Sequence, residues 1–181
     1  MIFKKTLITV FTLFISAAGC AQDVQETSQS TEEQQVNAKE LFDWVSMEEA
    51  QKLAGEHDKK VLVYINATWC GYCKKMEREV FTVEKVQEKT EEHFYPVWID
   101  IDVEDEFLTF RGRELSQREF AGAMRATGTP TFIFIDSEGE IIAGQPGFIP
   151  EEMYVQILDY VGTNAYQDQS FSEFAEMQSD S

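Results

Sequence analysis

The stretch 69–73 (WCGYC) constrains the fold more than any other, because it joins two segments of different periodicity. An apolar, β-branched run at 61–65 precedes it, and a charged, helix-forming run at 74–81 follows it. This order predicts a strand, a tight turn and a helix. Cys70 would then lie at the helix N-terminus, where unpaired N–H groups and the helix dipole stabilise an anion. We therefore expect a reactive thiolate at Cys70 at neutral pH.

The second cysteine, Cys73, lies three residues after Cys70, close enough to close a small disulfide. Cys70 would attack a disulfide, and Cys73 would resolve the mixed disulfide that forms. Two other interpretations stay open: a plain structural disulfide, and half of a zinc site. The redox interpretation is favoured because a C-x-x-C motif that opens a helix directly after a strand is the redox arrangement.

A zinc site would need more ligands than this pair supplies, since structural sites use four. The sequence holds three Cys and two His. Cys20 lies in the N-terminal segment, and His57 and His93 do not have the spacing of a ligand pair. We therefore expect no metal. No bound cofactor is needed, because the two sulfurs themselves carry the electrons.

The composition limits the classes of partner. A net charge of −18 argues against nucleic acid and against electrostatic binding to anionic lipid. A chain of 181 residues accommodates one domain with extensions. Its 14 Phe, 6 Tyr and 3 Trp indicate an aromatic-rich core, and with so few cysteines the fold does not depend on a disulfide framework.

The N-terminus has the pattern of an export signal, which we assign to residues 1–19. Two lysines precede an apolar run at 7–15, and small residues follow it. The run is too short for a comfortable transmembrane helix. Two cleavage forms stay open: lipidation of Cys20 as in bacterial lipoproteins, or a soluble-secretion cut after Ala21. We favour lipidation because cysteine is otherwise rare in this chain, and the expected location is the periplasm, anchored to a membrane.

Three segments follow the signal. Residues 20–39 are polar, with almost no large apolar side chain, and are expected to form a disordered tether. Residues 40–162 are expected to form the folded domain. Residues 163–181 are an acidic tail with scattered Phe, expected to be mobile or loosely docked.

Within the domain the patterns predict helices and strands in the order β-α-β-α-β-β-α after an initial helix, an α/β arrangement with a parallel crossover. Ser46 and Ser116 are each followed three residues later by Glu, the signature of a helix capping box. The segment 103–115 is expected to be an inserted loop with a helical turn. The expected helices are 47–56, 71–88, 117–126 and 151–161, and the expected strands are 61–65, 95–102, 131–135 and 140–143.

Two motifs, 69–74 (WCGYCK) and 128–131 (GTPT), resemble those of the thioredoxin superfamily, and the resemblance covers about residues 40–162. It implies a thioredoxin fold, with a central mixed sheet flanked by helices and, here, an inserted helical loop before the helix that leads to a cis-proline. Within the superfamily the chain is most similar to exported bacterial thioredoxin-like thiol–disulfide reductases, and to the C-terminal domain of the membrane thiol:disulfide interchange reductase.

The resemblance also implies roles for residues around the cysteines. The Thr129–Pro130 bond would be cis, Thr129 would stand beside the sulfurs, and this loop would present its backbone to an extended substrate. Trp69, Gly71 and Tyr72 would complete the substrate-binding surface, with Trp69 as a packing platform. The implied partners are disulfide-containing envelope proteins and an upstream membrane thiol electron donor.

One position departs from the family. Many thioredoxins carry a buried Asp on the strand before the motif, as the base for the resolving cysteine. Tyr64 occupies that position here, and the usual partner Lys is replaced near Trp98. The proton-transfer group is therefore unassigned, with Glu77, Glu79 and Asp100 as candidates.

The sequence thus predicts an exported thiol–disulfide oxidoreductase that reduces or isomerises disulfides. The alternative is a binding module, a chaperone or copper-delivery protein, that uses the two thiols as ligands. Copper binding would require a further soft ligand, and Met76 is the nearest candidate in the sequence. A methionine on a helix more often belongs to the core. We expect a reducing to intermediate redox couple, because Gly71 and Tyr72 lack a His that would stabilise the thiolate strongly.

Overall fold

The computed structural model of the chain describes residues 36–179. The predicted export signal, Cys20 and the predicted tether up to residue 35 lie outside this range. A short 3₁₀ helix, η1 (Ala38–Glu40), begins the described part, and Ala38 is already buried there. None of the helices formed by the described residues is both long and apolar enough to span a bilayer.

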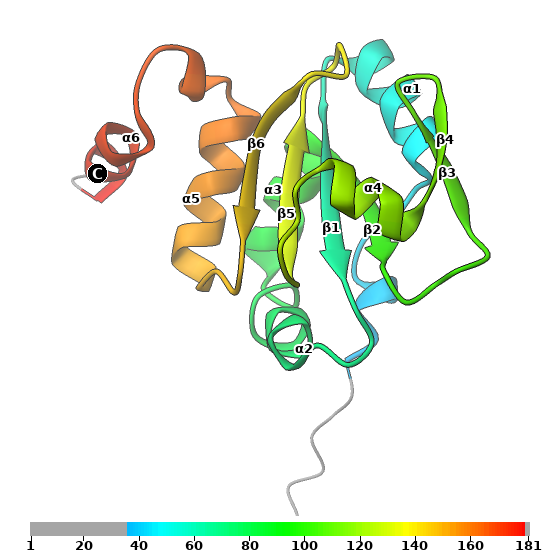
Figure 1. Cartoon of the computed structure of the whole chain (residues 1–181). Helices are drawn as coiled ribbons and strands as arrows, with labels where there is room; N and C mark the ends of the chain where they lie inside the picture. The colour runs from blue at the N-terminus through cyan, green and yellow to red at the C-terminus, as the bar shows by residue number, and fades with distance from the viewer. Residues whose placement is uncertain (1–35, 180–181) are drawn as a thin grey trace, which may run out of the picture. The chain divides into compact units, whose positions relative to one another are not determined.

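A four-stranded mixed sheet forms the centre of the domain (Figure 1). Its strand order is β2-β1-β5-β6. The β1 and β2 strands are parallel, and the remaining neighbours are antiparallel. This sheet confirms the predicted fold class. The strands are β1 (Lys60–Asn66), β2 (Phe94–Asp100), β5 (Thr131–Ile135) and β6 (Ile141–Pro146).

Helices cover both faces of the sheet, which explains why every residue of β1 is buried. Successive side chains of a strand point to opposite faces. Accordingly Val61, Val63 and Ile65 pack with α1 and α4, whereas Leu62 and Tyr64 pack with α2, α3 and α5. The helices are α1 (Met47–His57), α2 (Gly71–Glu79), α3 (Glu84–His93), α4 (Gln117–Ala123) and α5 (Glu151–Gly162).

The single helix predicted over residues 71–88 is wrong in one respect, because the structure forms two helices there, α2 and α3. Val83 adopts an extended conformation at the start of α3. The break places Val80 and Phe81 in the core, where both are almost fully buried. Burial of these two side chains outweighs the continuity of the helical pattern, which local sequence alone had favoured.

The predicted helical turn at 103–115 is also wrong, because this insertion is a β-hairpin of β3 (Phe107–Phe110) and β4 (Arg113–Ser116). Arg111 and Gly112, at the turn, both have positive φ, the geometry of the tight hairpin turn that matches strand twist. Leu108 and Phe110 are buried, whereas Phe107 and Thr109, which alternate with them, are exposed. The insertion therefore follows a period of two.

Both predicted serine caps form at the helix starts, but only the one at Ser116 is a complete capping box. The Ser46 hydroxyl accepts a hydrogen bond from the Glu49 backbone N–H. At α4, Ser116 and Glu119 form a complete capping box. These caps satisfy backbone donors that the first helical turn leaves unpaired.

The acidic tail contains a helix that the sequence did not predict. After η2 (Ala165–Gln167), α6 (Phe171–Ser179) begins, and its Phe174 is buried with its ring centroid 5.4 Å from that of Tyr160. The Tyr160 hydroxyl also donates to the Gln169 carbonyl at 2.6 Å. The tail is thus docked on α5 through its few aromatic side chains.

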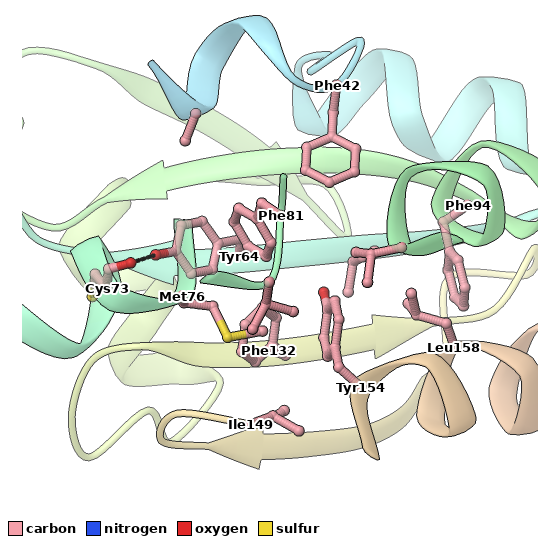
Figure 2. Close-up of a cluster of buried hydrophobic side chains, with 14 of the residues drawn as sticks. Phe42, Tyr64, Cys73, Met76, Phe81, Phe94, Phe132, Ile149, Tyr154 and Leu158 are labelled. Carbon is pink, nitrogen blue, oxygen red and sulfur yellow. Dashed lines mark hydrogen bonds between the residues drawn. The ribbon is translucent and has the colours of Figure 1, made fainter. Parts of the chain in front are cut away.

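An aromatic cluster lies behind α2, as the composition indicated (Figure 2). Phe81 is its centre, and its ring is 4.9 Å from that of Tyr64 and 5.3 Å from that of Phe42. Phe132 and Tyr154 close the cluster from β5 and α5. This cluster supports the helix that carries the cysteines.

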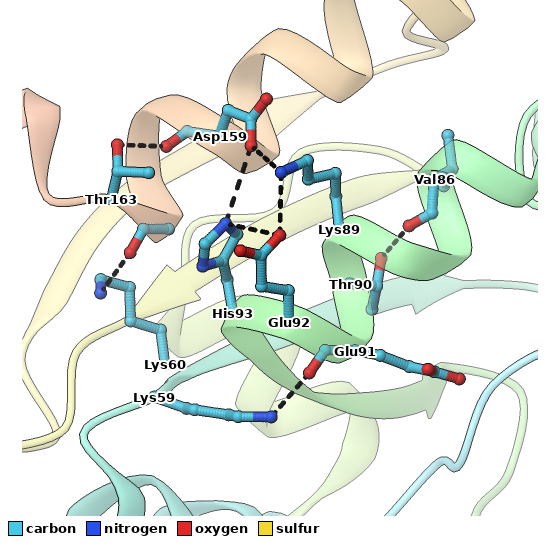
Figure 3. Close-up of polar contacts among 11 residues, drawn as sticks. Lys59, Lys60, Val86, Lys89, Thr90, Glu91, Glu92, His93, Asp159 and Thr163 are labelled. Carbon is cyan, nitrogen blue, oxygen red and sulfur yellow. Dashed lines mark hydrogen bonds and ion pairs between the residues drawn. The ribbon is translucent and has the colours of Figure 1, made fainter.

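At the other end of the sheet, His93 makes stability depend on pH (Figure 3). Its Nε2 lies 3.5 Å from a Glu92 oxygen and 3.7 Å from an Asp159 oxygen, with Lys89 bound to the same two carboxylates. Burial lowers the pKa of His93, and the charges of Lys89 and Lys60 lower it further. The carboxylates of Glu92 and Asp159 raise this pKa, but their effect is the smaller one. The folded state therefore disfavours the charged imidazole.

We expect this histidine to lower the stability as the pH falls below about 6.5, the ordinary histidine pKa, because the unfolded chain then binds a proton that the folded chain resists. Its contribution is greatest above that pH. Between pH 7.5 and 5.5, the free energy of unfolding measured in urea should fall more for wild type than for His93→Gln, whose side chain cannot titrate. Equal drops in the two proteins would contradict this assignment.

Candidate functional site

The two cysteines lie where β1 leads into α2, as predicted. Cys70 is the N-cap residue of α2, and Cys73 lies in its first turn. The two form a disulfide with their Cα atoms 5.2 Å apart. Cys70 is 4% exposed and Cys73 1% exposed, so both are buried and Cys70 is slightly the more exposed residue.

The surroundings of Cys70 suit a negative charge. The Cys73 backbone N–H donates to the Cys70 Sγ at 3.0 Å, the geometry of a side-chain N-cap. In a reduced protein this N–H and the N-terminal end of the α2 dipole would both stabilise a thiolate at Cys70. The helix start therefore favours an ionised, nucleophilic Cys70.

The GTPT loop lies at the same edge of the sheet as the cysteines. The β1–β5 register pairs Ile65 with Thr131, so the loop before β5 is placed beside the end of β1 (Figure 1). The Thr129–Pro130 bond is cis, as expected from the family resemblance. The Pro130 carbonyl accepts from the Gly147 N–H at 2.8 Å, and the Thr131 hydroxyl donates to the Gly128 carbonyl at 2.7 Å. These bonds hold the loop in place.

The residues around the sulfurs form an exposed aromatic rim. Trp69 is 69% exposed and Tyr72 is 66% exposed. Gly71 lies between the cysteines with open space where a side chain would begin. Large exposed aromatic side chains next to a reactive sulfur offer an apolar contact surface for another chain.

The structure shows a partner of Trp69 that sequence reasoning missed. Asp102, just after β2, accepts hydrogen bonds from the Thr68 backbone N–H at 3.0 Å, the Thr68 hydroxyl at 2.8 Å and the Trp69 Nε1–H at 3.2 Å. Arg118 lies 3.7 Å away on α4. The bonds from Thr68 lower the pKa of Asp102, with smaller contributions from Trp69 and Arg118. The carboxylate thus fixes the orientation of an otherwise exposed indole.

We expect Asp102→Ala to release Trp69. The KM for reduction of a protein disulfide, such as that of insulin, should rise several-fold because the mutation disturbs the contact surface. The rate of Cys70 alkylation should stay unchanged because the helix start is left intact. The Trp69 indole N–H should also exchange faster with solvent by NMR. Asp105→Ala, in the exposed loop nearby, is the control, and an unchanged KM and indole exchange in Asp102→Ala would refute the role.

Behind the cysteines, Tyr64 and Glu77 form a hydrogen-bonded pair. Tyr64 is completely buried, and its hydroxyl donates to the Glu77 Oε1 at 3.0 Å. The same hydroxyl lies 3.4 Å from the Cys73 carbonyl oxygen, the contact that Figure 2 marks with a dashed line. Burial raises the pKa of Glu77, and the charge of Asp100 acts in the same direction, against the Tyr64 hydrogen bond and Lys74. Burial also raises the pKa of Tyr64. The phenol therefore stays protonated and acts as a donor.

The other two candidate proton-transfer groups have different surroundings. Glu79 is exposed and forms ion pairs with Lys75 and Arg78 on the surface of α2. Asp100 is buried and accepts a hydrogen bond from the Asp102 backbone N–H. Of the three, Glu77 alone shares the α2 face of Cys73 and the Tyr64 hydroxyl.

Met76, the soft ligand considered for copper, is completely buried in the core cluster. In Figure 2 its sulfur lies toward Phe132, away from Cys73. Among the described residues, no three His, Cys, Asp or Glu side chains come together as a potential metal site. Met76 therefore serves packing.

The comparisons with known proteins agree with this geometry. The family model described as a thioredoxin-like domain matches residues 47–162. The chain is 26% identical over 157 residues to the thiol:disulfide interchange protein DsbD of Actinobacillus pleuropneumoniae, covering 84% of this chain and 25% of that protein. It is 24% identical over 139 residues to the disulfide bond reductase DsbH of Chlamydia pneumoniae, covering 76% and 82%.

The chain spans about a quarter of the length of the DsbD proteins it matches. Among solved structures, a thioredoxin-fold protein from Helicobacter pylori superimposes with a TM-score of 0.66 at 19% identity, covering 81% of this chain and 96% of that one. This likeness supports the fold. With the family model matching most of the described residues and the cysteine pair at the start of α2, the chain belongs to the thioredoxin-like domain family.

Proposed function

We propose that this protein is a thiol–disulfide oxidoreductase that reduces or isomerises disulfides in client proteins. The observation that carries the proposal is the Cys70–Cys73 pair at the start of α2, with Cys70 as the N-cap. In the reduced protein, the Cys70 thiolate attacks a client disulfide and forms a mixed disulfide. Cys73 then attacks the Cys70 sulfur, which releases the reduced client and restores the disulfide.

The surroundings of the pair support a protein client. Trp69 and Tyr72 offer an apolar rim, and Thr129 and Pro130 lie in a fixed loop at the same sheet edge. We propose that an extended client segment binds along this loop. The relatives carry the names thiol:disulfide interchange protein and disulfide bond reductase, which supports the same chemistry.

Insulin reduction by dithiothreitol or glutathione tests the activity. We expect the reduced protein to accelerate the reaction catalytically, and a Cys70→Ser, Cys73→Ser double variant to leave it at the background rate. A parallel copper(I) titration tests the alternative. Tight, stoichiometric copper binding without thiol turnover would overturn the enzymatic function in favour of a metal-delivery protein.

The direction of electron flow follows from the reduction potential. We propose a reducing to intermediate couple, because the two residues between the cysteines, Gly71 and Tyr72, supply no cation to stabilise the thiolate further. Equilibration with glutathione buffers, followed by mass spectrometry of alkylated protein, measures the potential. A reduction potential of about −120 mV, that of a dedicated oxidant, would overturn the proposal.

We propose that the protein works in the periplasm, attached to a membrane through a lipid on Cys20. The basic and apolar N-terminal pattern supports export, and clients there would be disulfide-containing envelope proteins fed by a membrane thiol electron donor. Wild type should pellet with membranes and Cys20→Ala should not, while both reduce a small disulfide equally. An unmodified mature chain that begins at Gln22 would refute the anchor in favour of soluble export.

A further inference from the structure

One edge of the central sheet is open to a further strand. The β6 strand lies at the end of the order β2-β1-β5-β6, and within residues 36–179 it pairs only with β5 (Figure 1). Its other side therefore presents backbone N–H and C=O groups to which another strand can bond. Five of its six residues are exposed, and Ile142 is the exception. The accessible edge is about 20 Å long, as expected for a strand of this length.

The sequence of β6 does not protect this edge. Edge strands of native proteins often carry charged side chains that prevent a further strand from pairing. The β6 residues, 141–146 (IIAGQP), carry no charge, although the net charge of the chain is −18. Pro146, which lacks an N–H, is the last residue of the strand, and the irregular pairing with β5 lies near the other end, beside Ile135. The middle of the edge is therefore regular and uncharged.

An apolar pocket lies directly beside this edge. Its volume is about 560 Å³, and β6, α5 and the docked tail line it. Met153 and Tyr160 line it from α5, and Phe171 lines it from the tail. The Met153 side chain is 48% exposed, which is unusual for a large apolar residue. The pocket thus offers an apolar surface next to unpaired backbone groups.

The strand geometry decides which side chains of a further strand would enter the pocket. In the β5–β6 register, Ala143 lies opposite Phe134, which belongs to the core on the α5 side of the sheet. Directly opposed residues point to the same face, so Ala143 also faces α5, and it lines the pocket. On a strand added to β6, every second side chain would point the same way. The pocket therefore fits apolar side chains at alternate positions of an extended peptide.

The open edge leads to the redox site. The residue after β6 is Gly147, whose N–H donates to the carbonyl of the cis-proline Pro130 at 2.8 Å. The Lys75 Nζ, on α2, lies 4.4 Å from the ring centroid of Phe148, in the same loop. The loop that follows β6 thus contacts both the cis-proline loop and the cysteine-bearing helix. A peptide bound along β6 would continue toward the surface around Cys70.

Charge favours a client segment over a second copy of this protein. Between residues 163 and 179, the docked tail contains Asp168, Glu173 and Glu176 but no Lys or Arg. A second copy would bring an identical acidic tail to the interface, and like charges repel there. A segment that carries Lys or Arg beside its apolar residues would instead complement the tail.

We propose that the open edge of β6 and the adjoining pocket bind an extended segment of a client protein, with alternating apolar side chains flanked by basic residues. The inference rests on the proposed thiol–disulfide activity and adds a docking site to it. The segment pairs its backbone with β6 as an additional strand and places every second side chain in the pocket. The client disulfide is thereby held near Cys70.

Fluorescence anisotropy on the oxidised protein measures the binding without any thiol reaction. The probe is a labelled peptide, free of cysteine, in which Val and Thr alternate between terminal lysines. We expect saturable binding that Met153→Glu weakens by about 10-fold or more, because it puts a charge among apolar groups. The added carboxylate would by itself attract the lysines, so weaker binding reports on the pocket. Met177→Glu, the same change on a 55% exposed Met of α6, is the matched control and should bind like wild type.

Backbone pairing is tested without changing the protein. Methylation of alternate peptide nitrogens removes the N–H groups from one side of the added strand. One set of methylated nitrogens should abolish binding and the other set should not, because only one side of the strand faces β6. The exchange of β6 amides with solvent should also slow in the complex. Equal effects of the two sets would overturn the inference, and these peptides decide should Met153→Glu fail to fold in urea-unfolding controls.

The link to turnover is tested with the same peptide extended by a cysteine that carries thionitrobenzoate in a mixed disulfide. Its KM should be several-fold lower than that of a version in which Ser replaces Val. In Met153→Glu the two KM values should converge, while the rate with 5,5′-dithiobis(2-nitrobenzoate), which has no peptide to dock, stays at the wild-type level. A difference in KM that survives in Met153→Glu would contradict the inference.

The outcomes separate this inference from the proposed function. A protein that reduces insulin but binds the peptide no better than Met153→Glu does overturns the inference alone. Binding along β6 without any thiol turnover overturns the proposed function and supports the docking site. A dimer in sedimentation analysis that Met153→Glu dissociates would assign the edge to a second copy. Binding of dodecanoate without binding of the peptide would assign the pocket to a lipid, and either of these two results would overturn the inference.

Discussion

Replacing Cys73 with Ser is expected to turn the protein into a trap for its clients, and replacing Cys70 with Ser is expected to trap none. In Cys73→Ser the Cys70 thiolate still attacks at the start of α2, but no thiol follows to resolve the adduct. In Cys70→Ser the remaining cysteine, Cys73, is the more deeply buried residue of the pair. Both variants should lower catalytic insulin reduction by about 10³-fold or more, because each removes a reacting atom.

The adducts are measured by acid quenching, alkylation and non-reducing electrophoresis of envelope extracts, followed by mass spectrometry. Cys73→Ser should give bands that dithiothreitol removes, and Cys70→Ser should give no more than the double variant. Iodoacetamide should label Cys70 before Cys73 in the reduced wild type. Equal trapping by the two single variants would contradict the assignment of nucleophile and resolving thiol.

Replacing Phe81 with Ala is expected to lower the free energy of unfolding by about 3–5 kcal/mol, the usual cost of removing a buried Phe. Phe81 is 1% exposed and its ring contacts those of Phe42, Tyr64, Phe132 and Tyr154. The cavity would open in the middle of the cluster, where neighbours held by the sheet and α5 cannot easily close it. Such a loss is a large share of the 5–15 kcal/mol that typically stabilises a domain.

Urea unfolding of the oxidised protein measures this loss. Phe107→Ala is the matched control, because it makes the same change on a side chain that is 62% exposed, and it should stay within about 0.5 kcal/mol of wild type. A loss below about 1 kcal/mol in Phe81→Ala would show that the cluster repacks, and that the break between α2 and α3 does not depend on burying this ring.

Much of the site could be predicted from the sequence because its signals are local. A C-x-x-C pair after a β-branched run determines a strand, a turn and a helix start, and the structure confirms Cys70 as the N-cap. The caps at Ser46 and Ser116 are likewise contacts between residues three apart. In these cases the interacting groups are neighbours in the chain, so their spacing alone determines whether they can meet.

Other features depended on tertiary contacts. The hairpin Phe107–Ser116 and the break at Val83 form because they place apolar side chains in a core built by distant segments, against what local helical patterns favoured. The residues that complete the site could not be identified from the sequence for the same reason. Asp102 and Trp69 are 33 residues apart in the chain.

Sequence could name Glu77, Glu79 and Asp100 as candidates, but it could not rank them. Tyr64 and Glu77 are 13 residues apart, and the sheet and α2 bring them to 3.0 Å. Proton affinity depends on burial and on the charges within a few ångströms, which a linear sequence does not specify. The motif alone therefore identified the two sulfurs that form the disulfide, whereas only the packing of α2 on β1 decided which carboxyl group lies behind them.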